Sequence, residues 1–136
     1  MTRILVIDDD ELFVKLMVHA LRERGHEVEF AHDGEAGEHA FDAKAFDAVV
    51  CDLMMPRQEG LETIRHMRRT VPNLAIVAIS SGLERESGVD ILDMAKRLGA
   101  HETVRKPFKL SQLTAAVDRA IIGASAPVPS SAITGA

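Results

Sequence analysis

The chain has 136 residues and a formal net charge of −5 at neutral pH, with 46% hydrophobic and 27% charged residues. This length and balance are typical of one globular domain, and the acidic charge argues against general affinity for nucleic acid, whose phosphates would repel it. No apolar run approaches a membrane span and the chain does not begin with a signal peptide, so we expect a cytoplasmic protein without membrane association.

Short apolar segments alternate with longer amphipathic ones along the chain. The apolar segments predict strands at Arg3–Ile7, Glu27–Ala31, Asp47–Cys51, Ala75–Ser80 and Glu102–Arg105. The amphipathic segments predict helices at about 11–24, 34–44, 59–70, 88–98 and 109–122. This alternation predicts a doubly wound α/β fold with a five-stranded parallel sheet, because parallel strands require crossover connections. The second strand alternates polar and apolar residues and is expected at an edge of the sheet.

After Gly123 the sequence changes to ASAPVPSSAITGA, which has two prolines, mostly small residues and no charge. We therefore expect a domain over residues 1–123 and a flexible tail or linker stub over 124–136. Side chains with a surface or core explanation receive no functional role. These are the six histidines and the arginines of the third predicted helix (Arg65, Arg68 and Arg69), expected on solvated surface, and the single cysteine, Cys51, expected as inert core.

Three consecutive aspartates, Asp8 to Asp10, follow the first predicted strand. One aspartate is enough to cap the helix that begins next, so two remain unexplained. Two carboxylates about 4 Å apart repel each other by roughly 4 kcal/mol near a protein surface. We therefore expect a positive charge in this cluster, either a metal cation or a lysine.

Polar side chains also occur where three later strands end: Asp52 after the third strand, Ser80 in the fourth and Lys106 after the fifth. In an open parallel sheet, ligands bind beyond the carboxyl ends of the strands, so these side chains are expected at the same edge as the aspartates. Carboxylates suit Mg²⁺, and a carboxylate can accept a phosphoryl group whose oxygens a lysine and a hydroxyl stabilise. This combination favours metal-dependent phosphoryl transfer.

Four sequence blocks, ILVIDDD, VVCDLMMPRQEG, AISSG and VRKPF, resemble the signature motifs of receiver domains of two-component response regulators. The resemblance covers residues 3 to about 122 and implies a flavodoxin-like sheet with strand order 2-1-3-4-5. It implies a stand-alone, chemotaxis-regulator-like switch rather than an enzyme. Such a switch receives its phosphoryl group from a histidine kinase or a histidine phosphotransfer protein and acts on a downstream protein that the sequence does not name.

Individual positions of this chain match the functional residues of that family. The resemblance makes Asp52 the phosphoacceptor, Lys106 the lysine that grips the phosphoryl oxygens, and Ser80 the switch hydroxyl. It also implies four Mg²⁺-binding groups: Asp8 (through water), Asp9, Asp52 and the backbone carbonyl of Met54.

The resemblance extends to structural positions and to an output surface. Pro107 matches a proline that follows a cis peptide bond, and Gly60 matches the glycine that lets the preceding loop turn into its helix. The surface that responds to phosphorylation is placed on the fourth helix, fifth strand and fifth helix, roughly residues 88–122. Thr103 stands on this surface where many receivers carry Tyr or Phe, so no aromatic switch is implied.

Two further departures from the family concern loops. The interval between Ser80 and Lys106 is longer than is common, and the excess falls in residues 82–90, where a lengthened loop would be free to touch a partner. Met54 and Gly82 occupy two positions that tune hydrolysis of the acyl phosphate in the family. Neither side chain orients a water molecule strongly, which predicts a long phosphoryl lifetime.

Two other functions fit parts of the sequence. A phosphatase of the haloacid dehalogenase type also uses an Asp-x-Asp after its first strand, a spacing that Asp8 and Asp10 satisfy. That class needs an acidic pair after the lysine, where only Asp118, inside a predicted helix, is present, and it leaves Asp52 unexplained. A pseudo-receiver, a binding module that is not phosphorylated, is the second alternative, and the complete set of acidic, hydroxyl and lysine residues argues against it.

Overall fold

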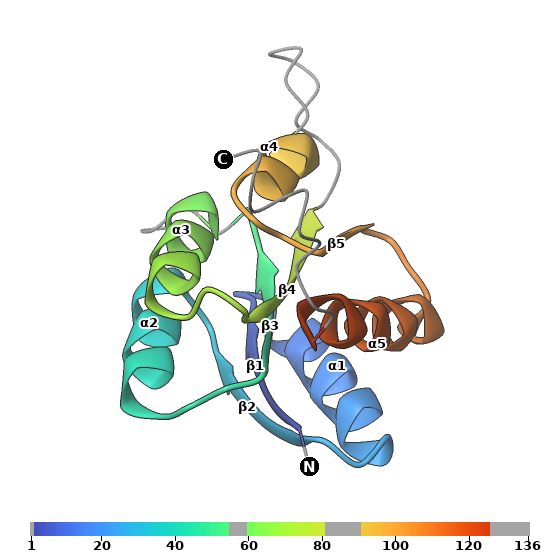
Figure 1. The fold of residues 1–136 in the computed structure, drawn as a ribbon. Coiled ribbons are helices and arrows are strands. Elements are labelled where there is room, and N and C mark those ends of the chain that lie inside the picture. The colour runs from blue at the N-terminus through green and yellow to red at the C-terminus, as the bar shows by residue number, and fades with distance from the viewer. Residues whose placement is uncertain (1, 55–59, 81–90, 126–136) are drawn as a thin grey trace.

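Strands and helices alternate throughout the part of the chain that the computed structural model describes, residues 2–54, 60–80 and 91–125 (Figure 1). The strands are β1 (Arg3–Ile7), β2 (Glu27–Ala31), β3 (Ala48–Asp52), β4 (Ala75–Ser80) and β5 (Glu102–Arg105). The helices are α1 (Glu11–Glu23), α2 (Gly34–Ala43), α3 (Gly60–Thr70), α4 (Ile91–Arg97) and α5 (Leu110–Ser125). The alternation predicted from the sequence is confirmed.

The strands form one parallel sheet in the order β2-β1-β3-β4-β5. The continuously apolar strands β1, β3 and β4 occupy its centre, where helices cover both faces and side chains such as Leu5, Val49 and Ile76 are fully buried. The alternating strand β2 lies at an edge, as predicted, with Glu27 exposed and Val28 buried. The flavodoxin-like α/β fold and its strand order are therefore confirmed.

Two hydrophobic cores lie on opposite faces of the sheet, because successive side chains of a strand point to opposite sides. The core beneath α1 and α5 contains Val6, Leu21 and Val117. The core beneath α2, α3 and α4 contains Leu5 and Ile64. Figure 1 shows the corresponding layers, with α1 and α5 on one side of the sheet and α2 and α3 on the other. With both faces covered, the ends of the strands remain available for a site.

The third strand and the fourth helix differ slightly from their predicted ranges. β3 begins and ends one residue later than predicted, because Asp52 still pairs with Ile79 of β4. The helix predicted at 88–98 is described as α4, Ile91–Arg97. The lengthened loop predicted at 82–90 lies outside the described residues. The shift of β3 by one residue places the backbone of Asp52 inside the sheet.

The last helix continues past its predicted end. α5 passes through Gly123 and ends at Ser125, although glycine has a low helix propensity. Ile121 and Ala124 pack against the core beneath α1 and α5, and this packing outweighs the propensity of one residue. The division into a domain over 1–123 and a tail over 124–136 stays a prediction, since residues 126–136 lie outside the described residues.

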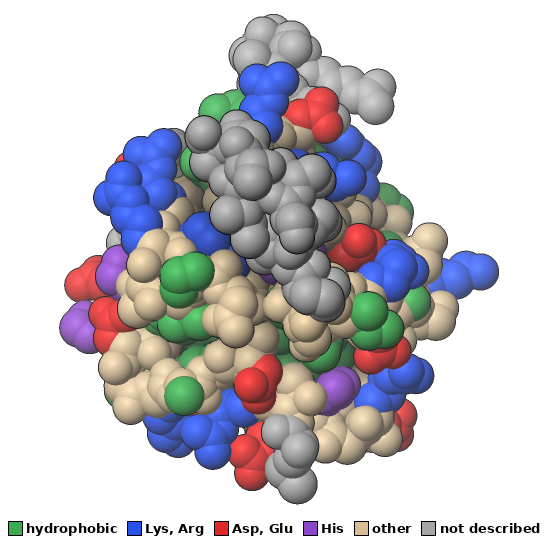
Figure 2. Space-filling model, in the orientation of Figure 1, with side chains coloured by type: hydrophobic (Ala, Val, Ile, Leu, Met, Phe, Trp, Pro, Cys, Tyr) green, Lys and Arg blue, Asp and Glu red, His purple; other side chains and the backbone are tan. Residues whose placement is uncertain are grey.

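The described surface carries charges of both signs. Basic and acidic side chains are interspersed over the face shown in Figure 2. Across the described ranges, every helix is too short or too polar to span a bilayer. Against this mixed surface, the concentration of polar side chains at one edge of the sheet is the most distinctive chemical feature.

Candidate functional site at the carboxyl edge of the sheet

The carboxyl ends of the strands gather the polar side chains singled out in the sequence. Ile7 pairs with Cys51, Asp52 with Ile79, and Ser80 with Arg105, so the four neighbouring strands end at nearly the same level. The residues that follow or end these strands are Asp8, Asp52, Ser80 and Lys106. The predicted gathering of these residues at one edge is present in the structure.

Three of the aspartates form a tight cluster. Carboxylate oxygens of Asp8, Asp9 and Asp52 lie within 4.8 Å of one another. Asp8 is fully buried and Asp52 is only 3% exposed, whereas Asp9 is exposed. Asp10 has a different role, because its Oδ1 accepts a hydrogen bond from the backbone N–H of Phe13 at 3.1 Å and caps α1. One aspartate thus caps the helix, as predicted, and the other two share a site with Asp52.

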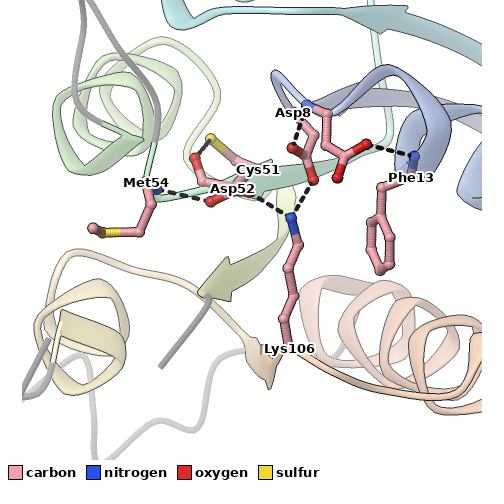
Figure 3. Close-up of polar contacts among 7 residues, drawn as sticks. Asp8, Phe13, Cys51, Asp52, Met54 and Lys106 are labelled. Carbon is pink, nitrogen blue, oxygen red and sulfur yellow. Dashed lines mark hydrogen bonds and ion pairs between the residues drawn. The ribbon is translucent and has the colours of Figure 1, made fainter. Parts of the chain in front are cut away.

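Lys106 supplies the positive charge that the cluster requires. Its Nζ donates hydrogen bonds to Oδ2 of Asp8 at 2.9 Å and to Oδ2 of Asp52 at 2.8 Å. Figure 3 shows the lysine side chain extending from the end of β5 to the two aspartates, with Phe13 beside it. The Phe13 ring centroid lies 4.6 Å from Nζ. Among the described residues, Lys106 is therefore the positively charged partner of these aspartates. The carboxylate positions that it does not use remain available to a metal ion.

Backbone groups hold the carboxylate of Asp52 in place. Oδ1 accepts a hydrogen bond from the backbone N–H of Met54 at 2.8 Å, while the Met54 side chain points away from the aspartates (Figure 3). Gly60, the first residue of α3, packs directly against the same segment. A Cβ atom there would lie 2.5 Å from the carbonyl oxygen of Asp52 and 2.6 Å from Cα of Leu53. A close approach to backbone, rather than a positive φ angle, accounts for glycine at this position.

Burial and charge shift the protonation of the site. Burial raises the pKa of Asp52 to about 6, and Asp8 adds to this increase, while hydrogen bonds from Lys106 and from Met54 N–H oppose it. Partial burial and then the neighbouring Asp8 raise the pKa of Asp9. Burial lowers the pKa of Lys106, but its bonds to Asp52 and Asp8 outweigh burial, so this pKa lies above its ordinary value. At neutral pH the site therefore holds a charged lysine beside a mostly ionised Asp52.

The oxygen-only donor set fits a hard divalent cation. Asp8 and Asp52 each use oxygens for the lysine and for one backbone N–H, of Asp10 and Met54 respectively. A carboxylate has about four acceptor positions, so both groups retain capacity, and Asp9 is accessible beside them. Mg²⁺ prefers oxygen ligands and commonly keeps several waters, and the exposed carboxylate of Asp9 leaves one side of the cluster open to water.

The remaining predicted site residues lie around the lysine. Ser80 is fully buried, and its carbonyl oxygen accepts a hydrogen bond from the backbone N–H of Lys106 at 2.6 Å. The Lys106–Pro107 peptide bond is cis, as the resemblance implies. Thr103 is half-buried on β5 and lines a surface cavity of about 550 Å³ together with Pro107 and Phe108. The same backbone segment therefore belongs both to the acidic site and to the face expected to respond to it.

Two aromatic residues at the site have no predicted role. The sequence pattern places Phe13 on the apolar face of the first helix and gives no indication that its ring contacts Lys106. In the structure its ring also meets the ring of Phe108 edge to face, with centroids 5.1 Å apart. The sequence indicates these residues only by their positions. Phe13 lies in the first helical turn after the aspartates, and Phe108 lies two residues after Lys106.

Comparisons with known proteins agree on one family. Residues 4–118 match the family model of the response regulator receiver domain. The response regulator MprA of Mycobacterium avium (strain 104) is 39% identical over 116 residues, which are 83% of this chain and 48% of that protein. The chain thus spans about half the length of the curated relatives it matches.

Solved structures give the same result. The receiver domain of NtrX from Brucella abortus superposes with a TM-score of 0.78 at 30% identity, covering 88% of this chain and 98% of that one. A response regulator receiver domain protein from Clostridium thermocellum superposes with a TM-score of 0.77 at 28% identity, covering 90% and 96%. Both similarities extend over nearly all of the described fold.

Proposed function

The chain belongs to the response regulator receiver domain family, and we propose that it accepts a phosphoryl group on Asp52 from a histidine kinase or a histidine phosphotransfer protein. Receiver domains are phosphoacceptor signalling modules of two-component systems rather than catalytic enzymes, so the family predicted from the motifs is confirmed and a phosphatase of the haloacid dehalogenase type is excluded. Membership also implies a cognate histidine kinase. The observation that carries the proposal is the buried Asp52 carboxylate, held by Lys106 and Met54 N–H beside two further acids.

The proposed reaction is an in-line transfer to a carboxylate. A carboxylate oxygen of Asp52 forms a new O–P bond while the P–N bond to the donor imidazole breaks. The electron pair of that bond returns to the ring nitrogen, and the ring takes up one proton from solvent. Asp52 must be ionised to attack, and its pKa of about 6 leaves it mostly ionised at pH 7.

We assign Mg²⁺ to Asp9, Asp52 and the backbone carbonyl of Met54, with Asp8 acting through water. The oxygen-only donor set and the spare acceptor positions of Asp8 and Asp52 support this assignment. When bound, the ion neutralises negative charge on the transferring phosphoryl oxygens. Without that compensation, the approach of an anionic donor to three carboxylates is opposed by charge repulsion.

Lys106 and Ser80 are the proposed ligands of the phosphoryl oxygens. Lys106 already lies 2.8 Å from Oδ2 of Asp52, so its ammonium group can move to a phosphoryl oxygen on the same side chain with little displacement. Ser80 ends the adjacent strand and supplies a hydroxyl at the same edge. The backbone bond between these residues couples any movement of one to the other.

We propose that the phosphorylated form is read at the face made by α4, β5 and α5. The cavity lined by Thr103, Pro107 and Phe108 lies on this face and contains Gln112 and Arg119 of α5. A partner gains from phosphorylation only through a difference in affinity between the two forms, and a hundredfold preference corresponds to about 2.7 kcal/mol. A cytoplasmic location remains part of the proposal, in agreement with the buried free thiol of Cys51.

The central test uses acetyl phosphate, which needs no kinase. With Mg²⁺ present, we expect intact-mass measurement to show one added phosphoryl group. Asp52→Asn should take up none, because asparagine is nearly isosteric but cannot form the acyl phosphate. Asp10→Asn is the matched control, since asparagine also caps helices and should leave uptake unchanged. Failure of the parent domain to take up phosphate would favour the pseudo-receiver alternative, and uptake by Asp52→Asn would move the acceptor to another residue.

A second test addresses the output. Ser80→Ala should leave phosphorylation of Asp52 largely intact while reducing a partner's preference for the phosphorylated form. The measurement compares partner affinity with and without beryllofluoride, a phosphoryl mimic, in the parent and in the variant. An undiminished preference would remove Ser80 from the coupling and direct attention to residues 82–90.

A further inference from the structure

The ammonium group of Lys106 contacts an aromatic ring in addition to two aspartates. Two of its donors are directed at Oδ2 of Asp8 and Oδ2 of Asp52. The ring of Phe13 lies over the same group, with the centroid 4.6 Å from Nζ. This is within the range in which an aromatic face attracts a cation, and the attraction strengthens where water is displaced. Three side chains, two of them acidic and one aromatic, therefore define the position of a single atom.

The Phe13 ring is itself held in place. Phe13 stands in the first turn of α1, and Asp10 fixes the helix start by accepting its backbone N–H at 3.1 Å. The ring meets Phe108 edge to face at 5.1 Å, with an interplanar angle of 86°. Both aromatic side chains are half-buried and pack against the core beneath α1 and α5. A ring fixed at the start of a helix and against a second ring presents a constant face to the lysine.

We propose that Phe13 is a positioning residue for phosphoryl transfer, whose ring face keeps the Lys106 ammonium group beside Asp52. This inference rests on the proposed phosphoacceptor role of Asp52. Lysine has a long side chain with many accessible rotamers, and confining it in advance reduces what must be ordered when the phosphoryl group arrives. The aromatic face restrains the cation without occupying any of its three donors. Lys106 can therefore exchange an aspartate oxygen for a phosphoryl oxygen while it remains over the ring.

An apolar packing role for Phe13 makes a different prediction from a cation–π role. Packing depends on volume, whereas the attraction for a cation depends on the negative face of the ring. Fluorination of the ring weakens that face and changes the volume little. The two roles therefore separate when 4-fluoro-, 3,5-difluoro- and 3,4,5-trifluorophenylalanine are placed at position 13.

The test measures the single-turnover rate of phosphorylation by acetyl phosphate at saturating Mg²⁺. We expect the rate to fall stepwise with each added fluorine, to about three- to tenfold below the parent for the trifluoro ring, with little change in thermal stability because the ring volume is kept. Phe13→Leu should lower the rate to a similar extent. The same series at Phe41, which stacks on Phe46 in the other core, is the matched control and should leave the rate unchanged. In a Lys106→Met background the effect of fluorination should vanish, as a double-mutant cycle requires.

A rate that is insensitive to fluorination, or equally sensitive without Lys106, would overturn the proposal and leave Phe13 as a packing residue. A second readout does not depend on chemistry. The Lys106 side-chain protons should show an upfield ring-current shift in NMR spectra of the unphosphorylated domain, and Phe13→Leu should abolish it. If the parent takes up no phosphoryl group, the proposed function fails, and the ring-current shift alone then decides whether Phe13 positions Lys106.

Discussion

The two ends of the sheet use charged and titratable side chains in opposite ways. At the carboxyl edge, Asp8 and Asp52 are buried beside each other, and their one close cationic partner among the described residues is Lys106. At the amino edge, Arg68 and His101 are half-buried and are matched by backbone groups. The first arrangement keeps like charges together, whereas the second pairs these side chains with backbone groups.

The amino edge is built from the end of α3 and the turn before β5. Arg68 donates to the carbonyl oxygen of Pro72 at 2.7 Å and to that of Gly99 at 2.6 Å. The ring Nδ1 of His101 accepts a hydrogen bond from the backbone N–H of Ile76 at 3.2 Å. The backbone N–H of His101 donates to the carbonyl oxygen of Ile76 at 2.8 Å. Hydrogen bonds between partly buried polar side chains and the backbone stabilise a fold, whereas crowded carboxylates cost stability. The difference indicates that the carboxyl edge is arranged for chemistry and the amino edge for structure.

The largest expected effect is on Mg²⁺ affinity, which should distinguish Asp9 from Asp10 at the carboxyl edge. Asp9→Asn should weaken Mg²⁺ binding by about 100-fold, or roughly 2.7 kcal/mol, because it removes a carboxylate assigned as a direct ligand. Asp10→Asn should leave the affinity within about twofold, because Asp10 caps α1 and lies outside the cluster. Isothermal titration calorimetry with Mg²⁺ measures both. Equal affinities in Asp9→Asn and the parent would defeat the ligand assignment.

Replacing one glycine at each edge with alanine should change the free energy of unfolding in opposite directions. Gly60→Ala should destabilise the domain by about 2 kcal/mol, because the new Cβ would meet the backbone of Asp52 and Leu53, which cannot rotate away. Gly123→Ala should stabilise it by about 0.5 to 1 kcal/mol, since the Cβ finds only the ring of His101, at 3.5 Å, and alanine favours the helix. Urea denaturation of both variants tests this pair. Destabilisation by Gly123→Ala would show that α5 is already tightly packed at that end.

A smaller effect is expected on the lifetime of the phosphorylated form. Met54 presents no polar group to a water attacking the acyl phosphate, so Met54→Asn should speed autodephosphorylation by about fivefold, close to 1 kcal/mol of barrier. Met54→Leu is the matched control and should change the rate little. The decay of phosphorylated protein after removal of acetyl phosphate gives the rate. Gly82, the second position of this prediction, lies outside the described residues. An unchanged rate in Met54→Asn would show that water is oriented by other groups.

The sequence predicted the fold and the main site from features that act locally or follow from strand direction. Apolar runs identified the central strands, and their parallel order brought Asp8, Asp52 and Lys106 to one edge. The need for a positive charge among the aspartates also followed, although the sequence alone left lysine and metal as alternatives. The contact between Lys106 and the two acids decides only the lysine half of that question.

The contacts that the sequence missed depend on tertiary placement of backbone or ring atoms. The expectation of a solvated surface is wrong for Arg68 and His101, whose partners are the backbone groups of Gly99 and Ile76. No residue pattern encodes the position of a carbonyl oxygen contributed by another turn. Phe13 was correctly placed on an apolar helix face, yet its face-on approach to Lys106 depends on how α1 packs beside β5. Periodicity predicts which side of a helix is buried, but not which atoms it meets.

The smallest predicted effect is on the pH dependence of domain stability, through His101 at the amino edge. Burial lowers the pKa of His101 below its ordinary value of about 6.5, and the nearby charge of Arg68 lowers it further, while Glu102 opposes the shift. The unfolded chain therefore binds a proton at higher pH than the folded domain does. The stability contributed by the neutral ring is fully present above about pH 6.5 and is lost as the pH falls through the interval down to the folded pKa.

His101→Gln should therefore flatten this loss, by a few tenths to about 1 kcal/mol between pH 7 and pH 5 after allowing for solvent screening. Asp52 titrates in the same interval with the opposite sign, because its raised pKa makes the folded domain bind the proton more tightly. The informative quantity is thus the difference between the parent and His101→Gln in denaturation free energy, measured in the same metal-free buffers, from which the contribution of Asp52 cancels. If the free energy of unfolding of the parent minus that of His101→Gln instead increased as the pH fell, the sign assigned to His101 would be reversed, and its charged form would be the one favoured at the amino edge.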